Sequence, residues 1–228
     1  MSTLLKALLP LTYIGRGQAF RPLFRLNRGL SKMGAAPPGP DKVQSQTLGW
    51  IEEYVIGLNL CPFAKASLVS GDLQVIVCQD KTAQAVREMV NDAAEALAKK
   101  TKTGDRGTVV IAAPYVQELS EFGAHLGLAA EIEDDFCWSG FDGEIQLATF
   151  HPCYQFEGTD EEDVKNWTNR SPWPLFHLLR EEEVSAAVDA YDGETDQIWQ
   201  TNEETMRSLG KDKLGALIYG DPKNTNLG

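Results

Sequence analysis

The chain has 228 residues, of which 43% are hydrophobic and 24% are charged, proportions typical of a folded domain with a sizeable core. No stretch approaches the roughly 18 apolar residues of a membrane span. The formal net charge of −12 argues against nucleic-acid binding, because phosphate backbones are held mainly by Lys and Arg.

The first 40 residues differ from the rest in charge. They hold six Lys or Arg and no acid, so the remainder has 15 basic against 33 acidic residues and a formal charge of −18. An acid-free, Arg-rich segment that begins with the apolar run LLKALLPL is typical of an organelle transit peptide, with a secretory signal as the weaker alternative. We therefore expect a mitochondrial or plastid protein after presequence removal, or a cytosolic form if translation starts at Met33.

A Pro- and Gly-rich stretch at 37–40 predicts the domain boundary, with a folded domain at 41–210 and a loose tail at 211–228. Within the domain, the apolar spacing alternates between helical and strand-like patterns. The predicted strands are 73–78, 108–113, 144–150 and 175–180. The predicted helices are 41–57, one capped by Thr82, 116–138, a short one at 159–167, one from 182 or 183 to 188, and 197–209.

This alternation predicts an α/β domain with an open, partly parallel sheet of about four strands flanked by helices. In such sheets, ligands gather at the carboxyl ends of the strands. The segment 175–180 is ambiguous, because a helix fits it nearly as well. As a strand it would place His177 and Arg180 on opposite faces, whereas a helix would place them on one face.

The densest mixture of polar and aromatic residues lies between 145 and 181. His151 directly follows a predicted strand, where a histidine can act as a general acid or base. Arg170 offers a planar guanidinium for a carboxylate or phosphate, or it ties down the acidic loop. Arg180 lies beside three glutamates, which favours a structural ion pair, and an interior structural role is the default for His177.

Four cysteines are irregularly spaced, and none is in a CxxC pair, so reduced thiols are expected. Cys61 is the one with a functional interpretation, because a turn after a helix, near Asn59 and Lys65, can lower its pKa and expose a thiolate. A buried apolar thiol is the alternative. No GxSxG, Walker A, GxGxxG or HExxH motif occurs, which excludes the common classes that those motifs mark.

Three blocks resemble a known family, the uncharacterised domain of unknown function 1415. They are WIEE…GLNLCPFA from Trp50, FHPCYQFEGT from Phe150, and TNRSPWPLFHLLRE from Thr168. The resemblance implies one compact α/β domain and brings no activity, cofactor or catalytic residue. The recognisable positions are polar and aromatic groups from distant parts of the chain, which is typical of an assembled site.

The leading hypothesis is a small-molecule enzyme of unknown reaction class that binds an anionic carboxylate or phosphate ligand at the strand ends. His151 is the expected acid or base, and Cys61 the nucleophile or a pocket wall. The expected ligand-binding residues are Arg170, Asn169, Tyr154, Gln155, Arg180, His177, Asn59 and Lys65. The alternatives are a metal or redox site built from Cys61, His151 and His177, and a protein-interaction module that docks through Trp167 and Trp173. The sequence leaves the cofactor and oligomeric state open.

Overall fold

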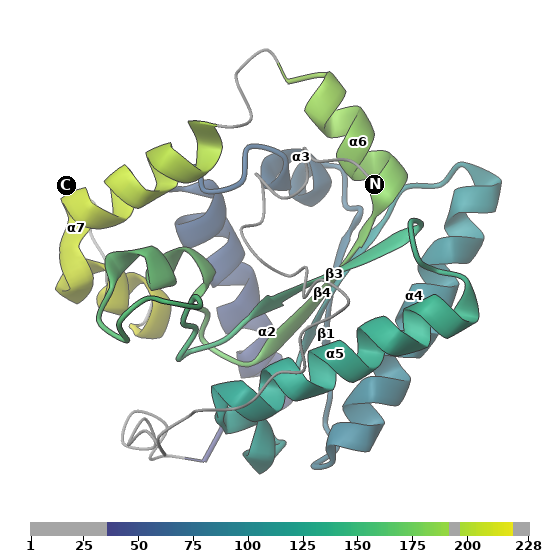
Figure 1. Cartoon of the computed structure of the whole chain (residues 1–228), viewed down its shortest axis with the longest axis horizontal. Helices are drawn as coiled ribbons and strands as arrows, with labels where there is room; N and C mark the ends of the chain where they lie inside the picture. Colours follow the sequence, from purple (N-terminus) through teal and green to yellow (C-terminus); the bar gives the residue numbers. More distant parts are fainter. Residues whose placement is uncertain (1–35, 192–196, 221–228) are drawn as a thin grey trace.

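A computed structural model of the chain describes residues 36–191 and 197–220. The predicted presequence, up to residue 35, and the last part of the predicted tail lie outside the described residues. The described part forms one sheet with helices on both faces (Figure 1).

The sheet has four strands in the order β1-β2-β4-β3. The strands are β1 (Leu73–Val77), β2 (Thr108–Ala112), β3 (Ile145–Phe150) and β4 (Leu175–Arg180). β1 and β2 are parallel, and β4 is antiparallel to both of its neighbours, β2 and β3. β1, β2 and β3 therefore run in one direction, and β4 is inserted between β2 and β3 in the other. This confirms the predicted open, partly parallel sheet and identifies residues 175–180 as a strand.

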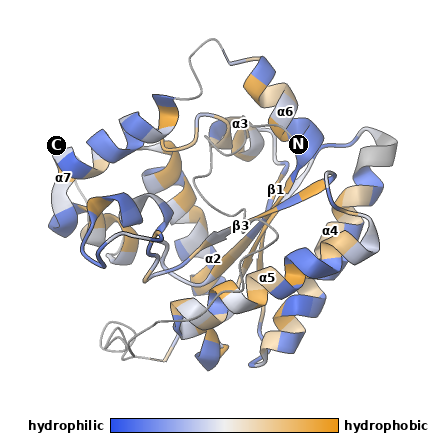
Figure 2. Cartoon of the chain, in the orientation of Figure 1, coloured by the Kyte–Doolittle hydropathy of each residue, from blue (hydrophilic) through white to orange (hydrophobic). Residues whose placement is uncertain are grey.

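One face of the sheet is covered by two long helices, α4 (Ala83–Thr103) and α5 (Phe122–Ser139), with a 3-10 turn η3 (Gln117–Ser120) before α5. The Thr82 side chain caps α4 as predicted, by accepting a hydrogen bond from the backbone N–H of Ala85. Apolar side chains of both helices pack on alternate strand residues such as Ile111 and Phe176, neither of which is exposed. Figure 2 shows the apolar strands beneath helices whose outer surfaces are hydrophilic.

The opposite face is covered in two parts. α2 (Pro40–Gly49), the π-helical η2 (Trp50–Ile56) and α7 (Ile198–Tyr219) pack, with the 3-10 turn η4 (Val164–Asn169), over the half of the face that holds Ala112 and Leu175. The short helix α3 (Ala64–Val69) and α6 (Glu181–Asp189) lie beyond that half, toward the end of the sheet where β4 finishes (Figure 1).

Three local predictions differ from the structure. The helix predicted to begin at residue 41 begins at Pro40, after Gly39, so Asp41 lies in its first turn. Residues 159–163 are not helical, because the Thr159 hydroxyl bonds to Phe156 O and Asn166, and Asp163 caps the turn that follows. The helix predicted to stop at Gly210 only kinks there, where φ is 73° and ψ is 160°.

The segment after Gly210 corrects the expectation of a loose tail. α7 continues to Tyr219 and buries Leu214 and Leu217 against the core. Among the helices of residues 36–191 and 197–220, none combines the length and apolar character that crossing a bilayer requires.

Candidate functional site

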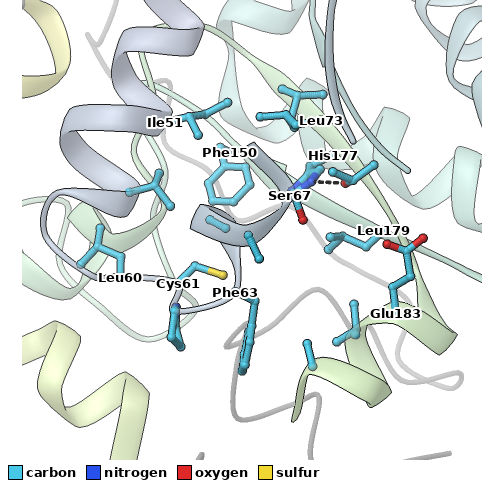
Figure 3. A pocket seen from close by; sticks show the side chains of 18 of the residues that line it. Ile51, Leu60, Cys61, Phe63, Ser67, Leu73, Phe150, His177, Leu179 and Glu183 are labelled. Atoms are coloured by element: carbon cyan, nitrogen blue, oxygen red, sulfur yellow. Dashed lines mark hydrogen bonds between the residues drawn. The ribbon is translucent and has the colours of Figure 1, made fainter. Parts of the chain in front are cut away.

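A cavity of about 940 Å³ lies on the face of the sheet that α2 and α7 cover only in part, a size in the range of small-molecule sites. Its floor is formed by sheet side chains, and η2, α3 and α6 supply its walls. The floor residues are Leu73, Thr108, Val110, Phe150, His177 and Leu179. Figure 3 shows four of these floor side chains around one space with side chains of the walls; the four are Leu73, Phe150, His177 and Leu179.

The position of this cavity differs from the expectation of a site at the carboxyl ends of the strands. Leu73 and Thr108 are the first residues of β1 and β2, so the cavity lies toward the amino ends of these two strands, and it also reaches Phe150, the last residue of β3. The carboxyl half of the same face is filled by Trp50, Tyr54 and Met206, all nearly or completely buried.

His177 is the histidine that faces the cavity. Its Nε2 lies 2.7 Å from the hydroxyl oxygen of Thr108, and the same hydroxyl donates to the carbonyl of Leu178 at 2.8 Å. Because the hydroxyl has a single hydrogen, it donates that hydrogen to the carbonyl and accepts from Nε2–H. This pairing favours the neutral tautomer with its hydrogen on Nε2, which leaves Nδ1 as the unprotonated nitrogen.

The surroundings keep this ring neutral. Burial lowers the pKa of His177 to about 4, because a charged imidazolium loses hydration in an apolar site. Phe150 lies beside the ring, with 6.4 Å between ring centroids. At neutral pH, His177 is thus an unprotonated base with a fixed tautomer.

Cys61 lines the opposite wall of the cavity from the turn after η2, and its sulfur points inward (Figure 3). Burial raises the pKa of the Cys61 thiol, partly offset by hydrogen bonds from the backbone N–H groups of Phe63 and Ala64. The turn is held from α7, where the amide of Asn202 donates to the carbonyl of Leu60 at 2.8 Å. The thiol is therefore protonated at neutral pH, contrary to the expected lowering of its pKa.

Asn169 contributes a third polar group to the cavity lining. Its side-chain oxygen accepts from the Thr168 hydroxyl at 3.1 Å, and its backbone carbonyl accepts from the N–H of His151 at 3.2 Å. Asn169 is only 5% exposed, and within the described part of the chain its side-chain NH₂ has no hydrogen-bond partner.

The cations around the cavity are already paired. Arg180 lies 2.5 Å from Glu183, Lys165 lies 3.2 Å from Glu203, and Arg106 is within 4 Å of Glu183. The described lining contains no other Lys or Arg. An anionic ligand would have to compete with these carboxylates.

His151 lies on the other face of the sheet and does not line the cavity. It is fully buried, and its ring packs 5.4 Å from Phe122 and 5.2 Å from His125, both on α5. Nε2–H donates to the carbonyl of Leu119 at 2.9 Å, and Nδ1 accepts from the N–H of Cys153 at 3.0 Å. With both nitrogens bonded to the main chain, His151 fixes the loop after β3 and has no free atom for acid-base chemistry.

Arg170 is also outside the cavity lining. Its guanidinium lies 4.6 Å from the ring centroid of Trp167 and donates through Nη2 to the carbonyl of Glu161 at 2.8 Å, while its Nε is buried and has no partner in the described part of the chain. Arg170 is thus held by the Trp167 ring and the Glu161 carbonyl, and it links these two parts of the loop between β3 and β4. Arg180 does line the cavity, although strand alternation predicted the opposite face, because it is the last residue of β4 and its guanidinium turns to Glu183.

The remaining predicted ligand-binding residues lie elsewhere. Tyr154 is buried, between the rings of Phe122 and Phe156. The side chain of Gln155 donates to a carbonyl within its own loop. Asn59 and Lys65 are exposed and do not line the large cavity. Of the ten predicted residues, the structure brings together Cys61, Asn169, His177 and Arg180.

Two alternative interpretations lose their geometric basis. Cys61 and His177 are separated from His151 by the sheet, and among the described residues no three His, Cys, Asp or Glu side chains are arranged to share a metal ion. The proposed docking anchors are not exposed either, because Trp167 is buried at 4% exposure and Trp173 is half-buried.

Sequence reasoning missed two residues that define this site. Thr108, which sets the tautomer of His177, is 69 positions away along the chain, and the contact follows only from the pairing of β2 with β4. Asn202 reaches the Cys61 turn from α7 across 142 positions. The one local signal was strand alternation, which places His177 beside Leu179 and Leu175 on one face.

The fold and cavity define a four-stranded α/β domain with a buried small-molecule-sized site. The family model described as "Protein of unknown function (DUF1415)" matches residues 42–216, and the chain belongs to this family. No curated protein and no solved structure matches the chain.

Proposed function

We propose that the protein is an enzyme that binds a neutral, mostly apolar small molecule in the cavity above β1, β2 and β4, and that His177 acts on it as a general base. The observation that carries the proposal is the state of the His177 ring. Thr108 fixes its hydrogen on Nε2, so the Nδ1 lone pair faces an apolar cavity in which a neutral imidazole is favoured.

The lining supports a ligand that is apolar over most of its surface. Phe150, Leu73 and Leu179 form much of the floor, and Ile51 and Phe63 lie in the walls (Figure 3). Apolar area removed from water contributes about 25 cal/mol per Å², so a ligand that fills the cavity gains most of its binding free energy from this lining. The NH₂ group of Asn169 is placed to orient one oxygen of such a ligand.

The anionic ligand expected from the sequence has weaker support. Arg170 lies behind Trp167, and Arg180, Lys165 and Arg106 are occupied by carboxylates. Displacing a carboxylate from a buried guanidinium leaves an uncompensated charge, which costs several kcal/mol. A neutral ligand avoids that cost.

The binding half of the proposal is tested with the neutral fluorescent dye N-phenyl-1-naphthylamine and a pair of matched substitutions. Ala187→Phe inserts a ring into the cavity wall on α6, and Ala96→Phe adds the same ring to the exposed surface of α4. We expect saturable dye fluorescence in the wild type and Ala96→Phe, and a loss of at least about tenfold in affinity in Ala187→Phe, since the added ring takes up ligand volume. Equal dye binding by the two variants would overturn the proposal.

Charge preference is tested by displacing the dye with decanoate and with its methyl ester, which share one alkyl chain. The methyl ester is expected to displace the dye more effectively near neutral pH. Stronger displacement by the carboxylate would restore the anionic-ligand hypothesis.

We further propose that residues 1–40 direct the protein to an organelle, on the basis of their basic, acid-free composition. A fluorescent protein fused after residue 40 should localise to mitochondria or plastids, and the same fusion started at Met33 should stay in the cytosol. Identical distributions of the two fusions would contradict this.

A further inference from the structure

Three polar side chains from distant parts of the chain line the same, largely apolar cavity. Cys61 comes from the turn before α3, Asn169 from the end of η4, and His177 from the middle of β4. The three lie up to 116 positions apart in the sequence. They supply a thiol, an amide N–H donor and a neutral base.

The side-chain amide of Asn169 indicates that the ligand carries an oxygen. Asn169 is only 5% exposed, and its side-chain NH₂ has no hydrogen-bond partner in the part of the chain that the structure describes. The nitrogen is not among the fully buried, unpaired atoms of the described residues, so it keeps contact with the open space of the cavity. A carbonyl oxygen in the cavity would satisfy this donor.

The surroundings of Cys61 favour negative charge on sulfur once a base is available. The nearby backbone N–H groups of Phe63 and Ala64 partly offset the rise that burial causes in the pKa of the thiol, and the Asn202 amide holds the preceding carbonyl of Leu60. Burial opposes a free thiolate, so the proton has to be removed as the reaction proceeds. His177 Nδ1 is the unprotonated nitrogen that faces the same cavity.

We propose that Cys61 is the nucleophile of an acyl-transfer reaction on a neutral, apolar ester or thioester, with Asn169 as donor to the carbonyl oxygen and His177 as the base. This proposal rests on the proposed function and adds the reaction and the substrate class. The sulfur attacks the carbonyl carbon, forming an S–C bond, while the thiol proton passes to Nδ1 of His177. The C–O or C–S bond to the leaving group then breaks, and the leaving alcohol or thiol takes the proton from Nδ1.

The acyl group, now a thioester on Cys61, is released by water. His177 takes a proton from the attacking water, the S–C bond breaks, and the sulfur regains a proton, so the products are a carboxylic acid and the free enzyme. No oxidant or reductant is required. Cys61 and His177 are not hydrogen-bonded to each other, so the proton transfer requires a contact that forms when substrate is bound.

The test uses p-nitrophenyl hexanoate as the probe, with the full-length protein. The wild type is expected to release p-nitrophenolate with a burst of about one equivalent per chain, the kinetic sign of a covalent acyl-enzyme. Mass spectrometry of the quenched protein should find one hexanoyl group, on the peptide that contains Cys61. Cys137→Ser, at an exposed cysteine, is the matched control and should behave like the wild type.

Three variants assign the roles. Cys61→Ala should lose the burst and the label, His177→Gln should slow acylation and remove its rise with pH, and Asn169→Leu should slow it by about 10²-fold, the typical effect of removing one oxyanion donor. Hexanoyl groups found only on Cys137 or on lysines, or an unchanged burst in Cys61→Ala, would overturn the proposal.

Dye binding separates the failure of this proposal from that of the proposed function. Cys61→Ala keeps the apolar lining, so a folded variant should still bind N-phenyl-1-naphthylamine. If the wild type binds the dye in the cavity but is never acylated at Cys61, acyl transfer is overturned and the apolar binding site stands. If the dye does not bind in the cavity, the proposed function itself fails.

Discussion

His151 and His177 lie on opposite faces of one sheet. His151 continues the face of β3 that packs on α5, beside Phe122 and His125, whereas His177 pairs with Val110 and Ala148 on the cavity face. The first has both nitrogens bonded to the main chain, and the second has one nitrogen free. This separation assigns a structural role to one histidine and the proposed chemistry to the other.

Replacing His151 should reduce stability and leave the cavity intact. His151→Leu removes the partners of the buried Leu119 carbonyl and the part-buried Cys153 N–H, and a buried group left unpaired costs about 1–3 kcal/mol. We expect urea denaturation to give a free energy of unfolding lower by at least about 2 kcal/mol, with dye affinity unchanged in the folded protein. A large loss of dye affinity at unchanged stability would show that His151 belongs to the site.

Acid should destabilise the protein through its buried histidines. Burial lowers the pKa of His151 to about 4 and that of His125 well below its usual value. Above about pH 6.5 the two histidine rings are neutral in both the folded and the unfolded chain. Below that pH the unfolded chain binds protons on these rings that the folded chain does not. The free energy of unfolding should therefore fall as pH drops from about 6.5 toward 4, by up to about 1.4 kcal/mol per pH unit for each histidine. Urea titrations across this range measure it, and a flat profile would contradict the burial of these rings.

His125 should be dispensable for folding. It is not exposed at all, and neither ring nitrogen has a hydrogen-bond partner among residues 36–191 and 197–220, while the ring centroid of Phe176 lies 4.5 Å from its own. His125→Met replaces two unsatisfied polar atoms with an apolar side chain of similar size, so we expect a gain of about 1 kcal/mol and a weaker acid dependence. A lower melting temperature near neutral pH would indicate a polar role for this ring.

The last turns of α7 should contribute measurably to stability. Leu217 is 3% exposed, in the core with Trp50 and Trp167, so Leu217→Ala should cost about 2–5 kcal/mol. Lys213→Ala, at an exposed position of the same segment, is the matched control and should change stability by less than about 0.5 kcal/mol. Equal melting temperatures for the two variants would restore the view that this segment is loose.

The positions of the strands were predictable because their signal is local. Runs such as TVVIA and LQVIV are apolar and β-branched, and they appear in the structure within one residue of the predicted ends. The continuation of α7 was not predictable in the same way. Gly210 and the lack of clear helical spacing pointed to a stop, and the packing of Leu214 against the distant first helices overrides that signal.

The site was only partly predictable because its residues are brought together by the order and direction of the strands. Alternation along β4 placed His177 and Arg180 on opposite faces of the sheet. It did not show which of the two faces carries a cavity. That depends on the insertion of an antiparallel β4 beside β2, which brings Thr108 to His177. A histidine after a strand, such as His151, was therefore favoured over one within a strand, although the strand histidine is the one that faces the cavity.

The most direct test of the account follows the histidine rings by NMR during titration with N-phenyl-1-naphthylamine, using long-range ¹H–¹⁵N correlations and His→Gln variants for assignment. Near neutral pH, His177 should show a hydrogen on Nε2 and an unprotonated Nδ1, and its signals should shift saturably with the dye while those of His125 and His151 stay in place. Saturable shifts of His151 with a silent His177, or a His177 that carries its hydrogen on Nδ1, would contradict the account.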